Sequence, residues 1–213
     1  MANALIYAAN LHQSRREGHI ADEQAEAALV LSREQGFAFR LAEATVLRGW
    51  ALVEQGQGEA GIAQIRQGIA AERATGSRTA GHLALLAKAY WHLGQSEEGL
   101  RVVAEALAIG NSNGEGRWTA ELCRLQGVLL RSLAAAPHGE AEICFQQALA
   151  IARRQQAKAW ELRAAMSLSR LWQQQGKRAE AHALLAPIYG WFTEGFDTAD
   201  LQDAKALLEE LEK

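Results

Sequence analysis

The sequence has 213 residues, with 22 Lys and Arg against 25 Asp and Glu, so its formal net charge is −3. That charge offers no general attraction to nucleic acid or to an anionic membrane. Hydrophobic residues make up 49% of the chain, which excludes a disordered protein. Only 2 residues are proline and alanine is abundant, which indicates an almost wholly helical protein, because alanine is the best helix former and proline the worst.

Three features of the sequence bear on its compartment. Cys123 and Cys144 are too few for a disulfide framework, so we expect two reduced, buried thiols. The first residues lack the basic stretch and the apolar core of a signal peptide. No apolar run approaches the roughly 20 residues that span a bilayer. The sequence therefore predicts a cytoplasmic protein that does not contact a membrane.

Apolar residues recur with the spacing of one helix face along almost the whole chain. In chain order, the pattern predicts helices over residues 3–15, 20–35, 38–55, 58–74, 79–93, 96–111, 116–134, 139–155, 158–175, 178–192 and 198–211. Glycine follows many of these segments, and glycine readily takes the left-handed conformation that ends a helix. The expected caps are Gly36, Gly56, Gly76, Gly94, Gly114, Gly176 and Gly195. The link at 134–139 is longer than the other turns.

The predicted helices form pairs, and equivalent residues of successive pairs are about 40 positions apart in the sequence. A small residue stands early in each second helix, at Ala21, Gly61, Gly99, Ala141 and Ala181. Another stands in four of the first helices, at Gly49, Ala87, Gly127 and Ser169. Small residues at a crossing let paired helices approach closely. We therefore predict an all-α solenoid of five helix pairs and a C-terminal capping helix.

We expect one domain over residues 1–213, because no Pro/Ser-rich linker or low-complexity tract interrupts the pattern. The predicted repeats cover residues 1–36, 37–76, 77–114, 115–157 and 158–195, and the cap covers 196–213. Terminal repeats of a solenoid need such a cap with a polar outer face.

The spacing of small and aromatic residues resembles the tetratricopeptide repeat (TPR), although these units are about six residues longer than its 34. Two stretches carry the resemblance, namely Leu86-Ala87-x-x-Tyr90-x-x-x-Gly94-x4-Gly99-x3-Val103-x2-Ala106-Leu107 and Ala141-x3-Phe145-x2-Ala148-Leu149. The resemblance implies a right-handed superhelix whose first helices line a concave surface.

Residues 141–157, 160–172 and 184–201 resemble the long-unit repeats of bacterial STAND-type signalling ATPases. The resemblance implies the helical C-terminal tail of such a protein, which would carry a class III adenylate/guanylate cyclase or act as a transcriptional regulator. The phosphate-binding loop G-x-x-x-x-G-K-[ST] is missing, because Gly176-Lys177 is followed by Arg178. We therefore expect an excised or truncated tail, with any ATPase domain upstream in the same parent chain.

The titratable residues predict neither catalysis nor a cofactor. The six histidines form no zinc-binding spacing, and neither cysteine pairs with a histidine at zinc-finger spacing. Cys123 lies in an apolar stripe of a helix, which suits core packing better than a nucleophile. We expect a protein that is not an enzyme and that binds no metal ion.

Helical periodicity selects the side chains that would point into the concave groove. The candidate binding residues are Glu43, Trp50, Lys88, Trp91, Arg124, Arg131, Arg163, Arg170 and Gln173. The two tryptophans either pack against a neighbouring helix or anchor a partner, since tryptophan is enriched at binding hot spots. The four arginines either form a solvated face or recruit carboxylates or phosphate through bidentate hydrogen bonds.

Two functional hypotheses follow from these patterns. The first is a non-catalytic interaction or sensor module that binds a peptide, an acidic protein partner or a small effector in its groove. The second is a helical-repeat protein that binds nucleic acid through its basic C-terminal half, where residues 153–178 carry seven Lys and Arg against Glu161. The net charge and the lack of an aromatic-plus-basic set in every repeat disfavour the second hypothesis.

Overall fold

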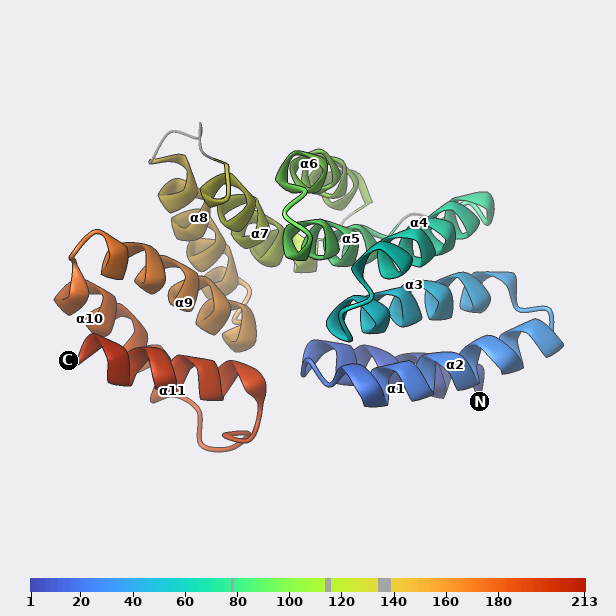
Figure 1. The fold of residues 1–213 in the computed structure, drawn as a ribbon, viewed down its shortest axis with the longest axis horizontal. Helices are drawn as coiled ribbons and strands as arrows, with labels where there is room; N and C mark the ends of the chain where they lie inside the picture. The colour runs from blue at the N-terminus through green and yellow to red at the C-terminus, as the bar shows by residue number, and fades with distance from the viewer. Residues whose placement is uncertain (78, 114–115, 134–138) are drawn as a thin grey trace. The chain divides into compact units, whose positions relative to one another are not determined.

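The computed structural model is built from α-helices joined by short turns (Figure 1). It describes residues 1–77, 79–113, 116–133 and 139–213, without the side chains of 111–113. The helices are α1 (Ala2–Ser14), α2 (Gly18–Glu34), α3 (Ala38–Glu54), α4 (Gly58–Ala74), α5 (Ala80–His92), α6 (Ser96–Asn113), α7 (Thr119–Arg131), α8 (Glu140–Arg154), α9 (Lys158–Gln174), α10 (Arg178–Tyr189) and α11 (Ala199–Leu211). A short 3₁₀ turn, η1 (Gly116–Trp118), precedes α7. The described residues contain no strand, so the prediction of an all-α repeat protein is confirmed.

The turns follow the predicted glycine pattern. The predicted caps Gly36, Gly56, Gly76, Gly94, Gly176 and Gly195 all have positive φ. Arg16 (φ 65°) and Gln156 (φ 54°) take the same conformation in the turns after α1 and α8, where the sequence offers no glycine. The expected cap Gly114 and the link at 134–138 lie outside the described residues.

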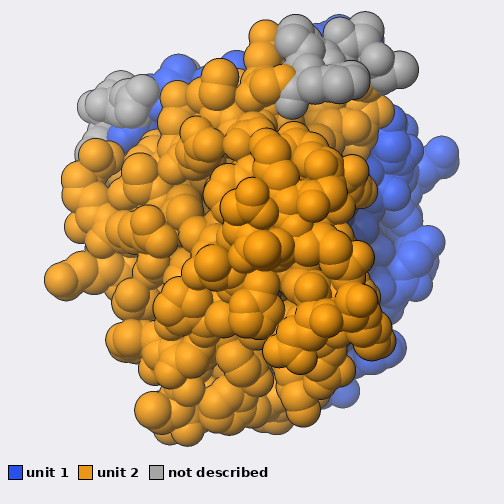
Figure 2. Space-filling view, turned by 90° about the vertical axis from the view of Figure 1, so that its left-hand side faces the viewer, with its two compact units in different colours: residues 1–115 blue, residues 116–213 orange. Residues whose placement is uncertain are grey.

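The helices group into two compact units, which Figure 2 colours separately. Unit 1 covers residues 1–115 and holds three helix pairs, whereas unit 2 covers residues 116–213 and holds two pairs followed by α11. The division falls where the sequence predicts the boundary between the third and the fourth repeat. Whether the two units form one domain, as the sequence predicts, stays a prediction.

Paired helices pack most closely where both carry small residues. A Cβ atom built on Gly49 of α3 would lie 2.8 Å from the carbonyl oxygen of Gly61 in α4. A Cβ on Gly68 of α4 would lie 2.9 Å from the carbonyl oxygen of Ala42 in α3. In unit 2, a Cβ on Gly127 would lie 2.6 Å from the Phe145 ring. These distances are too short for a methyl group, so the small residues set the separation of the helices.

The first helices of successive pairs contact one another, in the order α1, α3, α5 in unit 1 and α7, α9, α11 in unit 2. Among the described residues, α2, α4 and α6 make no such mutual contacts, and neither do α8 and α10. Each unit therefore curves with its first helices on the inner side. We call α1, α3 and α5 the inner row of unit 1, and α7, α9 and α11 the inner row of unit 2.

Helix α11 closes the end of unit 2. Its buried residues are Leu201, Ala204, Leu207 and Leu211, and they face α9 and α10, the two helices that α11 contacts. Its opposite face carries exposed Lys205 and Glu209. Burying one leucine contributes about 1.5–3 kcal/mol, so this apolar stripe matters to the stability of the whole unit.

A buried carboxylate joins α4 to α5 in unit 1. Glu72 is 1% exposed, and its Oε2 lies 2.7 Å from Nδ1 of His82, while Thr79 donates a hydrogen bond to its Oε1. Burial raises the pKa of Glu72, but the hydrogen bonds and the charge of His82 outweigh burial, so the net pKa is lowered. The Glu72–His82 contact joins α4 and α5 on either side of Gly76, so it stabilises the orientation of α5 relative to α4.

We predict that Gly49→Ala lowers the free energy of unfolding by about 1–2 kcal/mol, although alanine favours a helix by about 1 kcal/mol over glycine. The added methyl group meets the backbone of α4, which cannot turn away as a flexible side chain would. Urea unfolding followed by circular dichroism measures the change. Gly139→Ala is the control, because a Cβ at Gly139 meets no atom within 4 Å. Equal stability of the Gly49→Ala variant and the wild type would show that the contact is not set by the glycine.

Candidate binding surfaces on the inner rows

Trp50 of α3 is a core residue. Its side chain is 1% exposed, so of the two interpretations of Trp50 the packing one holds, and its assignment to an open groove is wrong. The ammonium of Lys88 lies 5.6 Å from the centre of the Trp50 ring. Lys88 also forms an ion pair with Glu54 of α3 at 2.9 Å. The inner row of unit 1 therefore covers the tryptophan with a salt bridge between α3 and α5.

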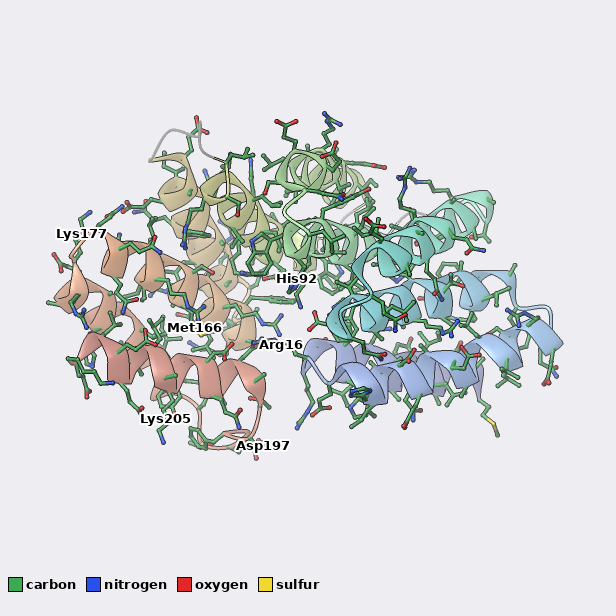
Figure 3. All side chains as sticks on the ribbon, in the orientation of Figure 1. Arg16, His92, Met166, Lys177, Asp197 and Lys205 are labelled. Atoms are coloured by element: carbon green, nitrogen blue, oxygen red, sulfur yellow. The ribbon has the colours of Figure 1, made fainter. Side chains whose placement is uncertain are left out.

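The other predicted groove residues of unit 1, Glu43, Lys88 and Trp91, are half-buried. Trp91 is half-buried, and its ring lies 4.9 Å from that of His92. His92 is the last residue of α5, and Arg16, whose charge acts on it, lies in the turn after α1; Figure 3 labels both. Burial lowers the pKa of His92, the charges of Lys88 and Arg16 lower it further, and Glu54 opposes them. Glu43 forms an ion pair with Arg40, one turn earlier in α3.

Carboxylates hold two of the four predicted arginines of unit 2. Arg124 donates two hydrogen bonds to Glu121, both at 2.7 Å. Arg163 donates to Asp200 of α11 at 2.6 Å and lies 5.0 Å from the centre of the Trp160 ring. Of the two interpretations of the four arginines, neither includes the ion pair between Arg163 and Asp200.

The other two arginines lie at the opposite ends of the same helices. Arg131 is the last residue of α7, and its Nη2 donates to Oε1 of Gln174 in α9 at 3.3 Å. Arg170 stands one turn before Gln174 on α9 and is exposed. Among the described residues, neither guanidinium forms an ion pair with a carboxylate. Burial lowers the pKa of Arg131, and the positive charge of Arg170 lowers it further.

The remaining predicted residue of unit 2, Gln173, contacts α11. Gln173 donates to Oε2 of Glu210 at 3.4 Å. Met166 is buried and lies between α9 and α11 in Figure 3. The sequence predicts Gln173 for the open surface, whereas Gln174, its neighbour, is the residue that Arg131 reaches.

Three of the seven cations in the basic segment 153–178 form ion pairs within unit 2. Arg153 and Lys158 both bind Glu161, at 3.0 and 2.8 Å. Burial raises the pKa of Glu161, but the hydrogen bonds and charges of these two partners outweigh burial, so the net pKa is lowered. With Arg163 on Asp200, the segment offers no continuous line of uncompensated positive charge.

Unit 1 also has a hollow that the sequence analysis missed. It encloses about 570 Å³ and is lined by Met1, Ala2, Asn3, Phe37, Ala38, Phe39 and Arg40. Its lining is mostly apolar, so no motif of polar residues marks it in the sequence.

Where the chain is described, no three His, Cys, Asp or Glu side chains gather as metal ligands. The same residues include no helix that is long and apolar enough to cross a bilayer.

Solved structures with TPR-like repeats share this fold. BtubC (BKLC) from P. vanneervenii is 16% identical with a TM-score of 0.65, over 95% of this chain and 89% of its own. A point variant of a putative kinesin light chain from Podosopora anserina, with nearly identical TPR-like repeats, is 20% identical with a TM-score of 0.55, over 88% of this chain and 92% of its own. No protein-family model and no curated protein matches the sequence. At these identities the likeness establishes the fold, a stack of TPR-like helix pairs, and nothing finer.

We predict that Trp50→Ala costs about 3–5 kcal/mol of unfolding free energy, whereas Trp91→Ala costs about 1 kcal/mol. The difference arises because Trp50 fills the contact between α3 and its neighbours while Trp91 keeps part of its ring in water. Urea denaturation of both variants makes the comparison. Similar losses from the two substitutions would contradict the assignment of Trp50 to the core and Trp91 to the surface.

Proposed function

We propose that the chain is a non-catalytic protein-interaction module and that a partner binds along the inner rows. The observation that carries the proposal is the pair Arg131 and Arg170, which the inner row of unit 2 presents together and to which no carboxylate of the described residues binds. Two neighbouring guanidinium groups favour a partner that supplies the opposite charge, because charge complementarity sets the specificity of interfaces.

The inner row of unit 1 supports the same function through different chemistry. Trp91 and His92 present aromatic surface beside the Lys88–Glu54 ion pair. Half-buried aromatic side chains contribute large contact area at low cost in side-chain entropy, which is why they anchor partners. Under this proposal Glu43, Lys88, Trp91, Arg131, Arg170 and Gln173 belong to the binding surfaces, Arg124 and Arg163 shape the surface of unit 2, and Trp50 supports the one in unit 1.

The proposal also includes the origin of the chain. Residues 141–157, 160–172 and 184–201, which resemble the tails of bacterial STAND-type ATPases, correspond to α8, α9 and the α10–α11 region. We propose that this module is the cytoplasmic helical tail of such a signalling protein and contacts its ATPase domain in cis. The two free, buried cysteines suit a reducing compartment.

Nucleic acid is the weaker candidate. A phosphodiester backbone needs a row of cations that follows its regular charges. Glu161 and Asp200 hold Arg153, Lys158 and Arg163 of this segment, and Arg170 forms a pair with Arg131 on the inner row of unit 2. A single pair suits one anionic group better than it suits a strand.

The proposal is tested by site-specific photocrosslinking. A photoreactive amino acid replaces Gln174 on the inner row of unit 2, or, as the control, Arg154, which is exposed on the second helix α8. Irradiation in extract of the source organism, followed by mass spectrometry, identifies the crosslinked peptides. We expect one partner protein, or one segment of the parent chain, to crosslink from position 174 and not from 154. Crosslinks that are the same from both positions would contradict an inner-row interaction site.

A further inference from the structure

Arg131 and Arg170 are held close to each other by the packing of unit 2. The helices α7 and α9 contact each other, and Arg131 crosses to α9 by its hydrogen bond to Gln174. Residues four apart on a helix have neighbouring side chains, so Gln174 places the Arg131 guanidinium within one turn of Arg170. The charge of Arg170 is near enough to lower the pKa of Arg131.

The other arginines on this face have carboxylate partners, which Arg131 and Arg170 lack among the described residues. Arg124 is held by both oxygens of Glu121, and Arg163 by Asp200. Glu210, a carboxylate on this side of α11, accepts a hydrogen bond from Gln173, and its backbone carbonyl accepts one from Arg178. Among the residues that the structure describes, the partner of Arg131 is an amide oxygen, so the pair keeps a local charge of +2.

The chemistry of the pair selects the ligand. A single carboxylate carries one negative charge and fills one guanidinium fork, so it leaves the second arginine uncompensated. A phosphoryl group on a side chain carries a charge of about −1.5 to −2 at neutral pH and has three acceptor oxygens. Two guanidinium forks match these oxygens, and the amide nitrogen of Gln174 is a further donor on the same turn of α9.

We propose that Arg131 and Arg170 together bind the phosphoryl group of a phosphorylated side chain in a partner protein, with Gln174 as a third hydrogen-bonding residue. The inference rests on the proposed function, since it names the chemistry of the partner at the inner row of unit 2. It makes partner binding dependent on phosphorylation. The module then binds its partner after a kinase has phosphorylated it, and a phosphatase that removes the phosphoryl group ends the interaction.

The test uses the peptide acetyl-Gly-Gly-phosphoSer-Gly-Gly-amide and its Ser and Glu counterparts as probes. The arginine Nε–Hε NMR signals of the full chain are recorded during titration with each peptide. We expect the phosphoserine peptide to shift the Arg131 and Arg170 signals together, with an affinity about tenfold higher than that of the Glu peptide, while the Ser peptide shifts neither. Affinity should fall as the pH drops below the second pKa of the phosphate, about 6, because the ligand then loses one charge.

Variants separate this site from general charge attraction. Arg131→Ala and Arg170→Ala should each weaken binding of the phosphoserine peptide by about tenfold, and Arg154→Ala should leave it unchanged. Equal affinities for the phosphoserine and Glu peptides would overturn the inference in favour of a carboxylate site. Binding of a labelled oligodeoxythymidylate that is lost in the same two variants would overturn it in favour of nucleic acid.

The two proposals fail in distinguishable ways. If position 174 crosslinks to the same partner before and after phosphatase treatment of the extract, the interaction site stands and the phosphoryl inference is wrong. If the phosphoserine peptide still binds at Arg131 and Arg170 of the chain that carries the photoreactive residue at position 174, but that position gives no more crosslinks than position 154, the anion site stands and the interaction function is wrong.

Discussion

The close approach of paired helices at small residues is the constraint on which the rest of the structure depends. Gly49 and Gly61 leave no room for a methyl group between α3 and α4, and Gly127 receives the ring of Phe145. Within each unit, successive pairs meet where the second helix of one pair packs on the first helix of the next, and their first helices also contact one another, whereas their second helices, among the described residues, do not. That arrangement produces the inner rows, and the inner rows decide which side chains share a surface.

In unit 2 the same packing divides the arginines by position along the helices. Towards the N-terminal ends of α7 and α9, Arg124 and Arg163 find Glu121 and Asp200 and are fixed by them. Towards the C-terminal ends, Arg131 donates a hydrogen bond to the amide of Gln174, and the charge of Arg170 is close enough to act on Arg131. Ion pairs at one end hold the surface in place, and under the proposed function the excess charge at the other end attracts a ligand.

Local sequence signals predict the fold well. The 3.6-residue periodicity and the glycines after each helix predict element bounds that lie mostly within a few residues of those observed. The left-handed turns at Arg16 and Gln156 could not be predicted, because these residues rarely take positive φ and do so here only because the packed helices on either side require it. The turn position is set by the repeat, not by the residue in it.

The candidate site is only partly predictable for a related reason. Periodicity places Trp50 on the inner side of α3, but how deeply its ring is covered depends on Lys88 and Glu54, which belong to different helices. Likewise, Asp200 is 37 residues away from Arg163, and no local pattern joins them. Arg131 and Arg170 were both predicted, because a seven-residue spacing from Arg124 and Arg163 keeps each pair on one helix face.

The central claim is that the fold holds Arg131 and Arg170 together against their mutual repulsion. A double-mutant cycle with Arg131→Gln and Arg170→Gln, measured by urea unfolding at low ionic strength without phosphate, tests it most directly. The account predicts an unfavourable coupling of about 0.5 kcal/mol between the two arginines, which disappears in about 1 M salt, where the Debye length is about 3 Å. A coupling free energy of zero, or a favourable one, at low ionic strength would contradict it.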